Sequence, residues 1–215
     1  MMSRVKTSRR PYDSSGRQAQ ARRSQEAVLE AAERQLVRAG YGATTIADIA
    51  ADAGVSVETI YKTFGGKAGL VRAIYDRGLR GQGTVSAYER SDEMRGRETN
   101  PTTIMRAWGE LTTEVAGQVT PIRLLMREAA ATDSDIAALL RASDDERLER
   151  MRHHAEFLLE RGYLRAGVSP EKATDIMYTC SSVEIYELLV LQRGWSPQEF
   201  AQFISDFLIS GLLPH

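Results

Sequence analysis

The stretch from Tyr41 to Leu70 reads YGATTIADIAADAGVSVETIYKTFGGKAGL, and it decides the fold. Its apolar residues recur three and four positions apart, as they do along one face of an amphipathic helix. The spacing predicts two short helices, at about residues 45–53 and 56–64. Between them, Ala53-Gly54-Val55 predicts a tight turn, because glycine takes a positive φ angle at little cost. The stretch therefore predicts a helix-turn-helix.

Capping and apolar residues predict how the two helices pack. Thr45 can cap the first helix, with Asp48 at its third position, and Ser56 can cap the second. The residues expected to face inward are Ile46, Ile49 and Ala50 in the first helix and Ile60 and Phe64 in the second. The opposite face of the second helix then presents Val57, Glu58, Thr59, Tyr61, Lys62 and Thr63.

The exposed face of the second helix has the chemistry of a DNA-reading surface. An α-helix fits the major groove, where its first residues meet base edges. Short and medium polar side chains can probe there, while Tyr61, Lys62 and Lys67 suit phosphate contacts. An ordinary helical hairpin with a solvated face would show the same spacing, so the spacing alone leaves both interpretations open.

At these residues the chain resembles the tetracycline-repressor (TetR) family of bacterial regulators. The matching residues are Gly40-Tyr41, Thr44-Thr45, Asp48-Ile49-Ala50, Ala53-Gly54-Val55-Ser56, Thr59-Ile60-Tyr61, Phe64, Lys67 and Leu70. The preceding helix, VLEAAERQLVRAGY, matches too, with Leu36 where the family more often has phenylalanine. The match covers about residues 24–75. Beyond it, the chain is similar to the family in length, in its all-α layout and in an Arg193-Gly194-Trp195-Ser196 turn.

The resemblance implies an N-terminal three-helix DNA-binding domain and a larger helical domain that forms a homodimer and encloses a small-molecule pocket. The implied base-reading positions are Val57, Glu58, Thr59 and Lys62. The implied phosphate-binding positions are Thr45, Ser56, Tyr61, Thr63 and Lys67. The partner would be a pseudo-palindromic operator in double-stranded DNA. Because base-facing positions vary within the family, these residues do not name the operator.

The rest of the chain is predicted to be helical. A helix from about residue 22 should end at Gly40, and another should run from Lys67 past Tyr75. Further on, a capping side chain precedes a proline at Asn100-Pro101, Thr120-Pro121, Ser169-Pro170 and Ser196-Pro197. Ser143 and Glu146 fit a capping box. These signals predict helices at about 101–119, 121–131, 133–141, 144–162, 170–193 and 197–212. No segment shows sustained period-two alternation, so we expect an all-α fold.

Charge is distributed unevenly along the chain. The 215 residues have a net charge of −1, but residues 1–80 hold 14 Lys and Arg against 8 acids, and the remainder holds 14 against 21. This asymmetry suggests a basic end that meets a polyanion. Residues 1–21 are polar and are expected to be disordered alone. This segment could clamp DNA with its basic residues, which are Arg4, Lys6, Arg9, Arg10 and Arg17. Such a tail could also serve only solubility.

Other classes of protein are disfavoured. The single cysteine, Cys180, excludes an internal disulfide and is expected to be a small buried residue. Without a spanning apolar run or a signal peptide, we expect a cytoplasmic protein with no membrane association. His153 and His154 lack further ligands at metal-binding spacing and are expected at the surface or a pocket rim, so no metal or cofactor is expected. The lack of clustered catalytic residues argues against a small helical enzyme.

We therefore divide the chain into a basic arm (1–21), a DNA-binding domain (22–68) and a regulatory and dimerisation domain (69–213). The apolar stripe through Phe203 and Phe207 suits either an intrachain core or a dimer interface formed by helices 170–193 and 197–212. An effector pocket of a few hundred Å³ would take a small, largely apolar molecule. Its candidate lining is Met105, Trp108, Leu125, Met126, Phe157, Met177 and Tyr178, with Arg123 and Glu184 as polar anchors. The expected function is that of a ligand-responsive dimeric regulator, a repressor released by its effector. The alternative is a non-specific or architectural DNA-binding protein.

Overall fold

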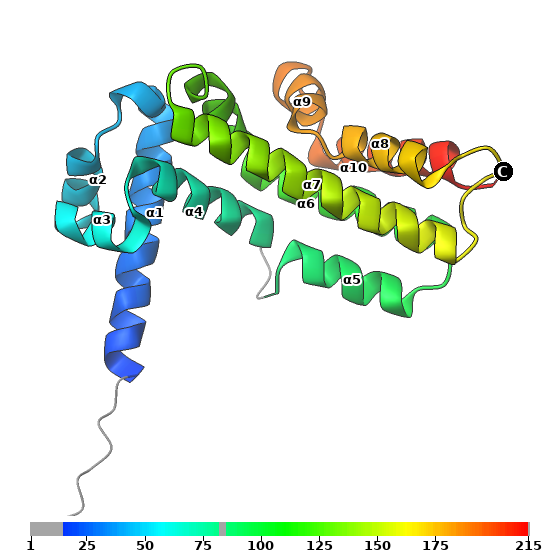
Figure 1. The fold of residues 1–215 in the computed structure, drawn as a ribbon, viewed down its shortest axis with the longest axis horizontal. Coiled ribbons are helices and arrows are strands. Elements are labelled where there is room, and N and C mark those ends of the chain that lie inside the picture. Colours follow the sequence, from blue (N-terminus) through cyan, green and yellow to red (C-terminus); the bar gives the residue numbers. More distant parts are fainter. Residues whose placement is uncertain (1–14, 82–84, 215) are drawn as a thin grey trace, which may run out of the picture.

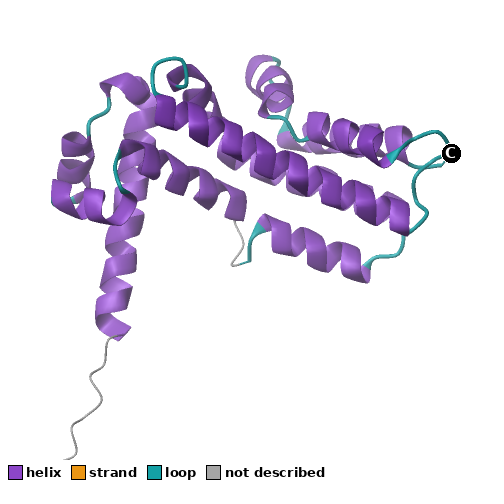
Figure 2. Cartoon of the chain, viewed as in Figure 1, coloured by secondary structure: helices purple, strands orange, loops and turns teal. Residues whose placement is uncertain are grey.

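The computed structural model describes residues 15–81 and 85–214 (Figure 1). The helices are α1 (Ser15–Ala43), α2 (Ile46–Ala53), α3 (Val57–Phe64), α4 (Lys67–Arg80), α5 (Ala87–Arg97), α6 (Pro101–Ala129), α7 (Ser134–Glu160), α8 (Pro170–Cys180), α9 (Val183–Tyr186) and α10 (Pro197–Leu212). A π-helical segment, Glu187–Gln192, follows α9. No strand occurs among the described residues, which confirms the predicted all-α fold (Figure 2).

The helices form two connected parts. The helices α1 to α4 gather at one end of the molecule, and the long helices α6 and α7 extend from them to the other end (Figure 1). One apolar core joins Leu36, Ile49 and Ile60 of the first part to Ile122 of α6. A second core surrounds Trp108 of α6 and contains residues of α7, α8 and α10. Because the first core crosses the expected limit at residue 68, the two parts share packing instead of being joined by a linker.

The first helix begins earlier than the sequence predicted. It starts at Ser15, not near residue 22, so residues 15–21 of the expected disordered arm are helical. Gly40 interrupts the helical geometry at φ 81°, close to the predicted end. Of the basic residues in the expected arm, Arg4, Lys6, Arg9 and Arg10 lie outside the described residues.

Two predicted pairs of helices are single helices. The predictions 101–119 and 121–131 are wrong as separate elements, because α6 runs through Pro121. Val119 and Ile122 on either side of Pro121 are buried, and this packing holds the helix together across the proline. Likewise, α7 replaces the predicted 133–141 and 144–162. Ser143 does not cap a helix there. It is buried, donates to the Leu140 carbonyl (2.7 Å) and accepts a hydrogen bond from Arg123.

Two further differences from the predicted helices are a broken helix and an additional one. The predicted 170–193 helix breaks at Ser181 and Ser182, giving α8, α9 and the π-helical segment. The sequence analysis missed α5, where a capping box of Ser86 and Glu89 starts the helix despite nearby glycines. By contrast, α10 spans the predicted 197–212 and begins with a capping box. None of the helices in the described ranges is long and apolar enough to cross a membrane.

Candidate DNA interface and ligand cavity

Capping bonds and one glycine hold α2 and α3 in a helix-turn-helix. Thr45 Oγ1 accepts a hydrogen bond from the Asp48 amide (3.1 Å), and Ser56 Oγ accepts one from the Thr59 amide (3.1 Å). Gly54 lies between the helices at φ 67°, in the left-handed region that favours glycine. Its N–H donates to carbonyls at the end of α2. The predicted caps and turn are therefore confirmed.

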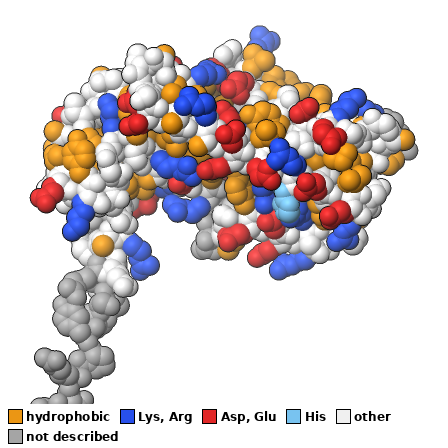
Figure 3. Space-filling view, viewed as in Figure 1, with side chains coloured by type: hydrophobic (Ala, Val, Ile, Leu, Met, Phe, Trp, Pro, Cys, Tyr) orange, Lys and Arg blue, Asp and Glu red, His pale blue; other side chains and the backbone are white. Residues whose placement is uncertain are grey.

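The two faces of α3 differ as predicted. Ile60 is fully buried and Phe64 half-buried against the core that also holds Ile49. The six residues expected to face outward are all exposed, namely Val57, Glu58, Thr59, Tyr61, Lys62 and Thr63. Figure 3 shows hydrophobic side chains on the surface over α2 and α3, next to charged ones. Tyr61 is 55% exposed and Val57 41% exposed, so a rigid helix presents apolar as well as polar groups to a partner.

Close packing of α4 fixes the end of α3. A Cβ atom at Gly69 would lie 1.7 Å from the Phe64 carbonyl oxygen, so only glycine fits there. The sequence analysis did not use this residue. An isolated glycine inside a helical pattern is the signal that could have identified the close approach.

Lys67 has partners within the protein. Its ammonium group donates to the carbonyls of Tyr41 (2.7 Å) and Thr44 (3.1 Å) and lies 4.1 Å from the centre of the Tyr41 ring. These contacts tie the start of α4 to the segment between α1 and α2. An ammonium group has three donors, so a phosphate contact by Lys67 would use the third. That contact stays a prediction.

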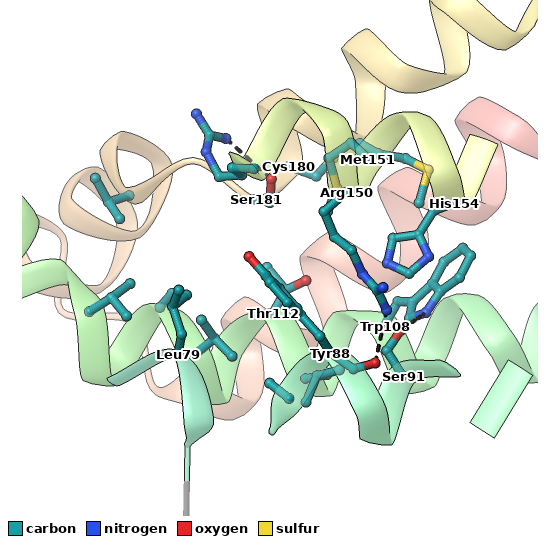
Figure 4. Close-up of a pocket in the computed structure, with 18 of the residues that line it drawn as sticks. Leu79, Tyr88, Ser91, Trp108, Thr112, Arg150, Met151, His154, Cys180 and Ser181 are labelled. Carbon is teal, nitrogen blue, oxygen red and sulfur yellow. Dashed lines mark hydrogen bonds between the residues drawn. The ribbon is translucent and has the colours of Figure 1, made fainter. Parts of the chain in front are cut away.

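A cavity of about 100 Å³ lies between α4, α5, α6, α7 and α8. Its wall includes aliphatic groups such as Leu79, Val119 and Met177, and polar groups such as Tyr88 and Thr112 (Figure 4). Cys180 also belongs to the wall, and burial raises the pKa of its thiol to about 12. This confirms the predicted buried cysteine. The volume is below the few hundred Å³ that the sequence analysis expected.

The side chains of Trp108 and His154 pack together in the cavity wall. The indole N–H of Trp108 donates to Ser91 Oγ (2.9 Å), and the ring centres of Trp108 and His154 are 4.3 Å apart. His154 is 4% exposed and lines the cavity, so it lies in the pocket wall and not at the surface, the other position that the sequence left open. Burial, followed by the nearby charges of Arg150 and Arg95, holds the pKa of His154 well below its ordinary value of 6.5. The imidazole is therefore neutral at pH 7.

The structure separates the predicted ligand residues. Trp108, Arg123 and Met177 line the cavity. Met105, Leu125 and Met126 are buried core residues, and Phe157 packs against Trp108 without lining the cavity. Tyr178 and Glu184 instead line a second pocket, of about 330 Å³, to which Arg123 also belongs.

Four cavity residues on α7 were not among the predicted ligand residues, and one of them is Met151. Arg147, Arg150 and His154 recur at three- and four-residue spacing, which places them on one face of a helix. The spacing is visible in the sequence. Charged residues on a helix usually face solvent, however. Only the packing of α6 and α8 against α7, together with the hydrogen bonds from Arg150 to α5, reveals that this face is enclosed.

Comparison with known proteins gives a family for the N-terminal part and a fold for most of the chain. Residues 28–74 match the family described as bacterial regulatory proteins, tetR family. An uncharacterized HTH-type transcriptional regulator, YvkB of Bacillus subtilis (strain 168), is 41% identical over 58 residues. That match spans 27% of this chain and 31% of the relative, so the chain matches less than a third of that protein's length.

Solved structures resemble the fold over a much larger share. The SmeT–triclosan complex has a TM-score of 0.70 at 18% identity, with 89% of this chain and 92% of that chain covered. NalD, the secondary repressor of the MexAB-OprM multidrug efflux pump in Pseudomonas aeruginosa, has a TM-score of 0.67 at 16% identity, with 90% and 98% covered. At such identities the likeness shows the fold alone.

Proposed function

We propose, from the premise that this chain belongs by its N-terminal domain to the tetR family of bacterial regulatory proteins, that it is a dimeric repressor released from its operator by a small molecule. The fold is that of a DNA-binding transcriptional regulator. The sign of regulation, the response to a ligand, the dimer and the domain limits at residues 22–68 and 69–213 are parts of the proposal.

The observation that carries the proposal is the surface of α3. Its inward face is anchored by Ile60, and both of its ends are fixed, by Ser56 and by the approach of Gly69. The outward face is thus rigid and open, as a helix that enters the major groove must be. In this assignment Val57, Glu58, Thr59 and Lys62 meet base edges. Thr45, Ser56, Tyr61, Thr63 and Lys67 meet phosphates.

Two observations support the response to a ligand. The larger part of the chain encloses a cavity with apolar walls and a few polar groups, the usual composition of a small-molecule site. The similar SmeT structure is a complex with triclosan, and the similar NalD is the secondary repressor of a multidrug efflux pump. A molecule that binds better to a conformation with misplaced α3 helices would lower operator affinity by its differential affinity alone.

Exposed apolar residues near the C-terminus support the dimer. Leu188 and Leu191 of the π-helical segment and Phe203 and Phe207 of α10 are all substantially exposed. The rings of Trp195, Phe203 and Phe207 form a row, with centres 5.7 and 6.2 Å apart. An exposed apolar patch of this kind is typical of an interface, and the same patch on two subunits can pair by two-fold symmetry.

Selection of bound sequences from random DNA duplexes tests the proposal. The full chain should enrich a pseudo-palindrome whose half-sites are separated by about one helical turn, 10–10.5 base pairs, or a multiple of it. Binding without any enriched sequence would favour the non-specific or architectural DNA-binding protein. Enrichment of a single unpaired half-site would contradict the dimer but would still support α3 as the helix that contacts the bases.

A further inference from the structure

The wall of the cavity is unusually rich in positive charge. Arg123, Arg147 and Arg150 line it, whereas no Asp or Glu is among the described residues of the lining. Their side chains are only 7%, 17% and 12% exposed. Buried cations are costly unless paired, so the supply of counter-charge decides what this wall can bind.

Two carboxylates behind the wall are each shared by two arginines. Asp92 pairs with Arg150 (2.5 Å) and with Arg95 (3.1 Å). Asp144 pairs with Arg123 (2.7 Å), and its second partner is Arg147, at 3.5 Å. The four guanidinium groups therefore outnumber the carboxylates that contact them two to one. A further anion in the cavity would relieve this imbalance.

Unpartnered polar atoms lie at one end of the cavity. Arg150 Nε and His154 Nδ1 are both buried and have no hydrogen-bond partner in the described part of the chain. The two residues are four apart on α7, and Figure 4 shows their side chains next to each other beside Trp108. Buried polar groups are nearly always hydrogen-bonded, so an unpaired donor here marks a place for a ligand oxygen.

The opposite end of the cavity contains aliphatic side chains, and the guanidinium groups of Arg123 and Arg147 in the wall are paired with Asp144. Leu79 lies at the far side of the view from His154 and Trp108, with Tyr88 and Thr112 between them (Figure 4). Val115, Val119 and Val183 also belong to the lining. A ligand that fills the cavity would therefore be polar at one end and apolar at the other.

We propose that the cavity binds a small organic acid, with its carboxylate held by Arg150 Nε and His154 Nδ1 and its apolar body directed toward Leu79. This inference rests on the proposed ligand-responsive function and names the class of effector. The volume of about 100 Å³ is smaller than the roughly 150 Å³ of a cavity that takes up benzene, so it suits a short-chain acid. The second pocket is a weaker candidate, because its lining contains its own acids, Asp144 and Glu184.

Binding of acids and matched amides to the full chain tests the inference. A Trp195→Phe variant leaves Trp108 as the only tryptophan, so its emission reports on the cavity. The probes are the short-chain acids from propanoate to pentanoate and the corresponding primary amides. The acids should change Trp108 emission saturably, and the amides should bind at least about tenfold more weakly. Equal binding of acids and amides, or no binding of any acid, overturns the inference.

Two variants should change acid affinity in opposite directions. Arg150→Gln should weaken acid binding by about tenfold, whereas Asp92→Asn should strengthen it by freeing the arginine from its carboxylate. Arg152→Gln is the matched control, because this exposed arginine lies two residues further along α7 and should leave affinity unchanged. If Arg150→Gln and Asp92→Asn weakened acid binding alike, Arg150 would serve only the fold and the inference would fail. The comparison of acids with amides in the parent chain does not depend on either variant folding.

Operator release separates this inference from the proposed function. Acids that bind in the cavity but leave operator affinity unchanged would contradict the ligand response and keep the inference. If neutral apolar molecules released the operator and no acid bound to the cavity, the ligand response would be kept and the inference of an acid ligand would be contradicted.

Discussion

At the scale of single residues, the proposed function assigns two tasks, base contact and phosphate contact, to different side chains of α3. Val57 and Glu58 stand in the first turn, where a helix in the major groove meets base edges. Tyr61 lies one turn further on and is 55% exposed. Base contacts specify sequence and phosphate contacts fix register, so substitutions at these positions should have different consequences.

We expect Val57 and Glu58 to determine base preference. Glu58→Gln or Val57→Ala should shift the preferred base at one position by roughly 1–3 kcal/mol, measured by competition among operator variants. Tyr61→Phe is the control within the same helix and should weaken all duplexes alike, because every phosphate is the same. A Glu58→Gln chain with an unchanged sequence preference would place Glu58 away from the bases.

We expect His154 to make stability depend on pH near neutrality. Its pKa in the fold lies well below 6.5, the ordinary value, mainly because the ring is buried. As the pH falls below 6.5, the unfolded chain takes up a proton that the folded chain cannot accept. The free energy of unfolding should therefore decrease, by at most about 1.4 kcal/mol per pH unit.

Chemical denaturation between pH 7 and about 5, in a buffer free of carboxylic acids, measures this dependence above the range in which Asp and Glu titrate. His154→Gln should flatten the slope, whereas His153→Gln, at the exposed neighbouring residue, should keep it. Equal slopes in the two variants would contradict the assignment to His154.

At the scale of elements, α6 shows how packing overrides a local signal. Thr120-Pro121 has the pattern of a helix start, yet the helix continues because residues on both sides of it are buried. Proline inside a helix removes one backbone hydrogen bond and crowds the preceding turn. Pro121 therefore lowers the free energy of unfolding, and replacing it should raise that free energy again.

Pro121→Ala should raise the free energy of unfolding, by roughly 1–3 kcal/mol, because the new amide can donate within the helix. Pro101→Ala is the matched control. Pro101 occupies the first turn of the same helix, where a missing N–H costs nothing, so this variant should bring no such gain. Denaturant midpoints of both variants and the parent provide the test. A Pro121→Ala chain no more stable than the parent would mean that the proline relieves strain elsewhere in α6.

The helix α7 touches both functional regions. At its start, the Tyr41 hydroxyl donates to Asp133, the residue that caps α7 (2.8 Å). Further along, Glu146 pairs with Arg72 of α4 (3.2 Å), and Arg150 and His154 reach the cavity. A ligand that moves α7 would thus also move helices that pack against α2 and α3. This packing would connect the cavity physically to the proposed DNA-binding surface.

At the scale of the whole molecule, the apolar row of Trp195, Phe203 and Phe207 should hold two chains together. Sedimentation at micromolar concentration should give about twice 23.9 kDa. Phe203→Glu combined with Phe207→Glu should give a folded monomer, because two charges would be buried in a symmetric interface. Val37→Glu, at an equally exposed apolar residue of α1, should leave the dimer intact. A double variant that still sediments as a dimer would place the interface elsewhere.

The sequence by itself determined the local features of this protein. The caps Thr45 and Ser56, the turn at Gly54 and the two faces of α3 follow from side-chain chemistry within a few residues, and all were predicted. The start of α10 at Pro197 was predicted for the same reason. The motif at about residues 24–75 likewise gave the resemblance to the TetR family, and the family model matches residues 28–74, because a helix-turn-helix is built mainly from contacts between residues close in sequence.

Only the tertiary structure decided which helices continue past a local stop signal and which residues line the cavity. Pro121 and Ser143 were predicted to start helices, but contacts from other elements hold α6 and α7 through them. His154 was expected at the surface or a pocket rim and Arg150 was not predicted to face a cavity, but contacts with α5 and α6 enclose both side chains. Burial depends on residues far apart in the sequence, and no local pattern reports it. The charge of the cavity, and with it the proposed class of ligand, therefore follows only from the tertiary structure.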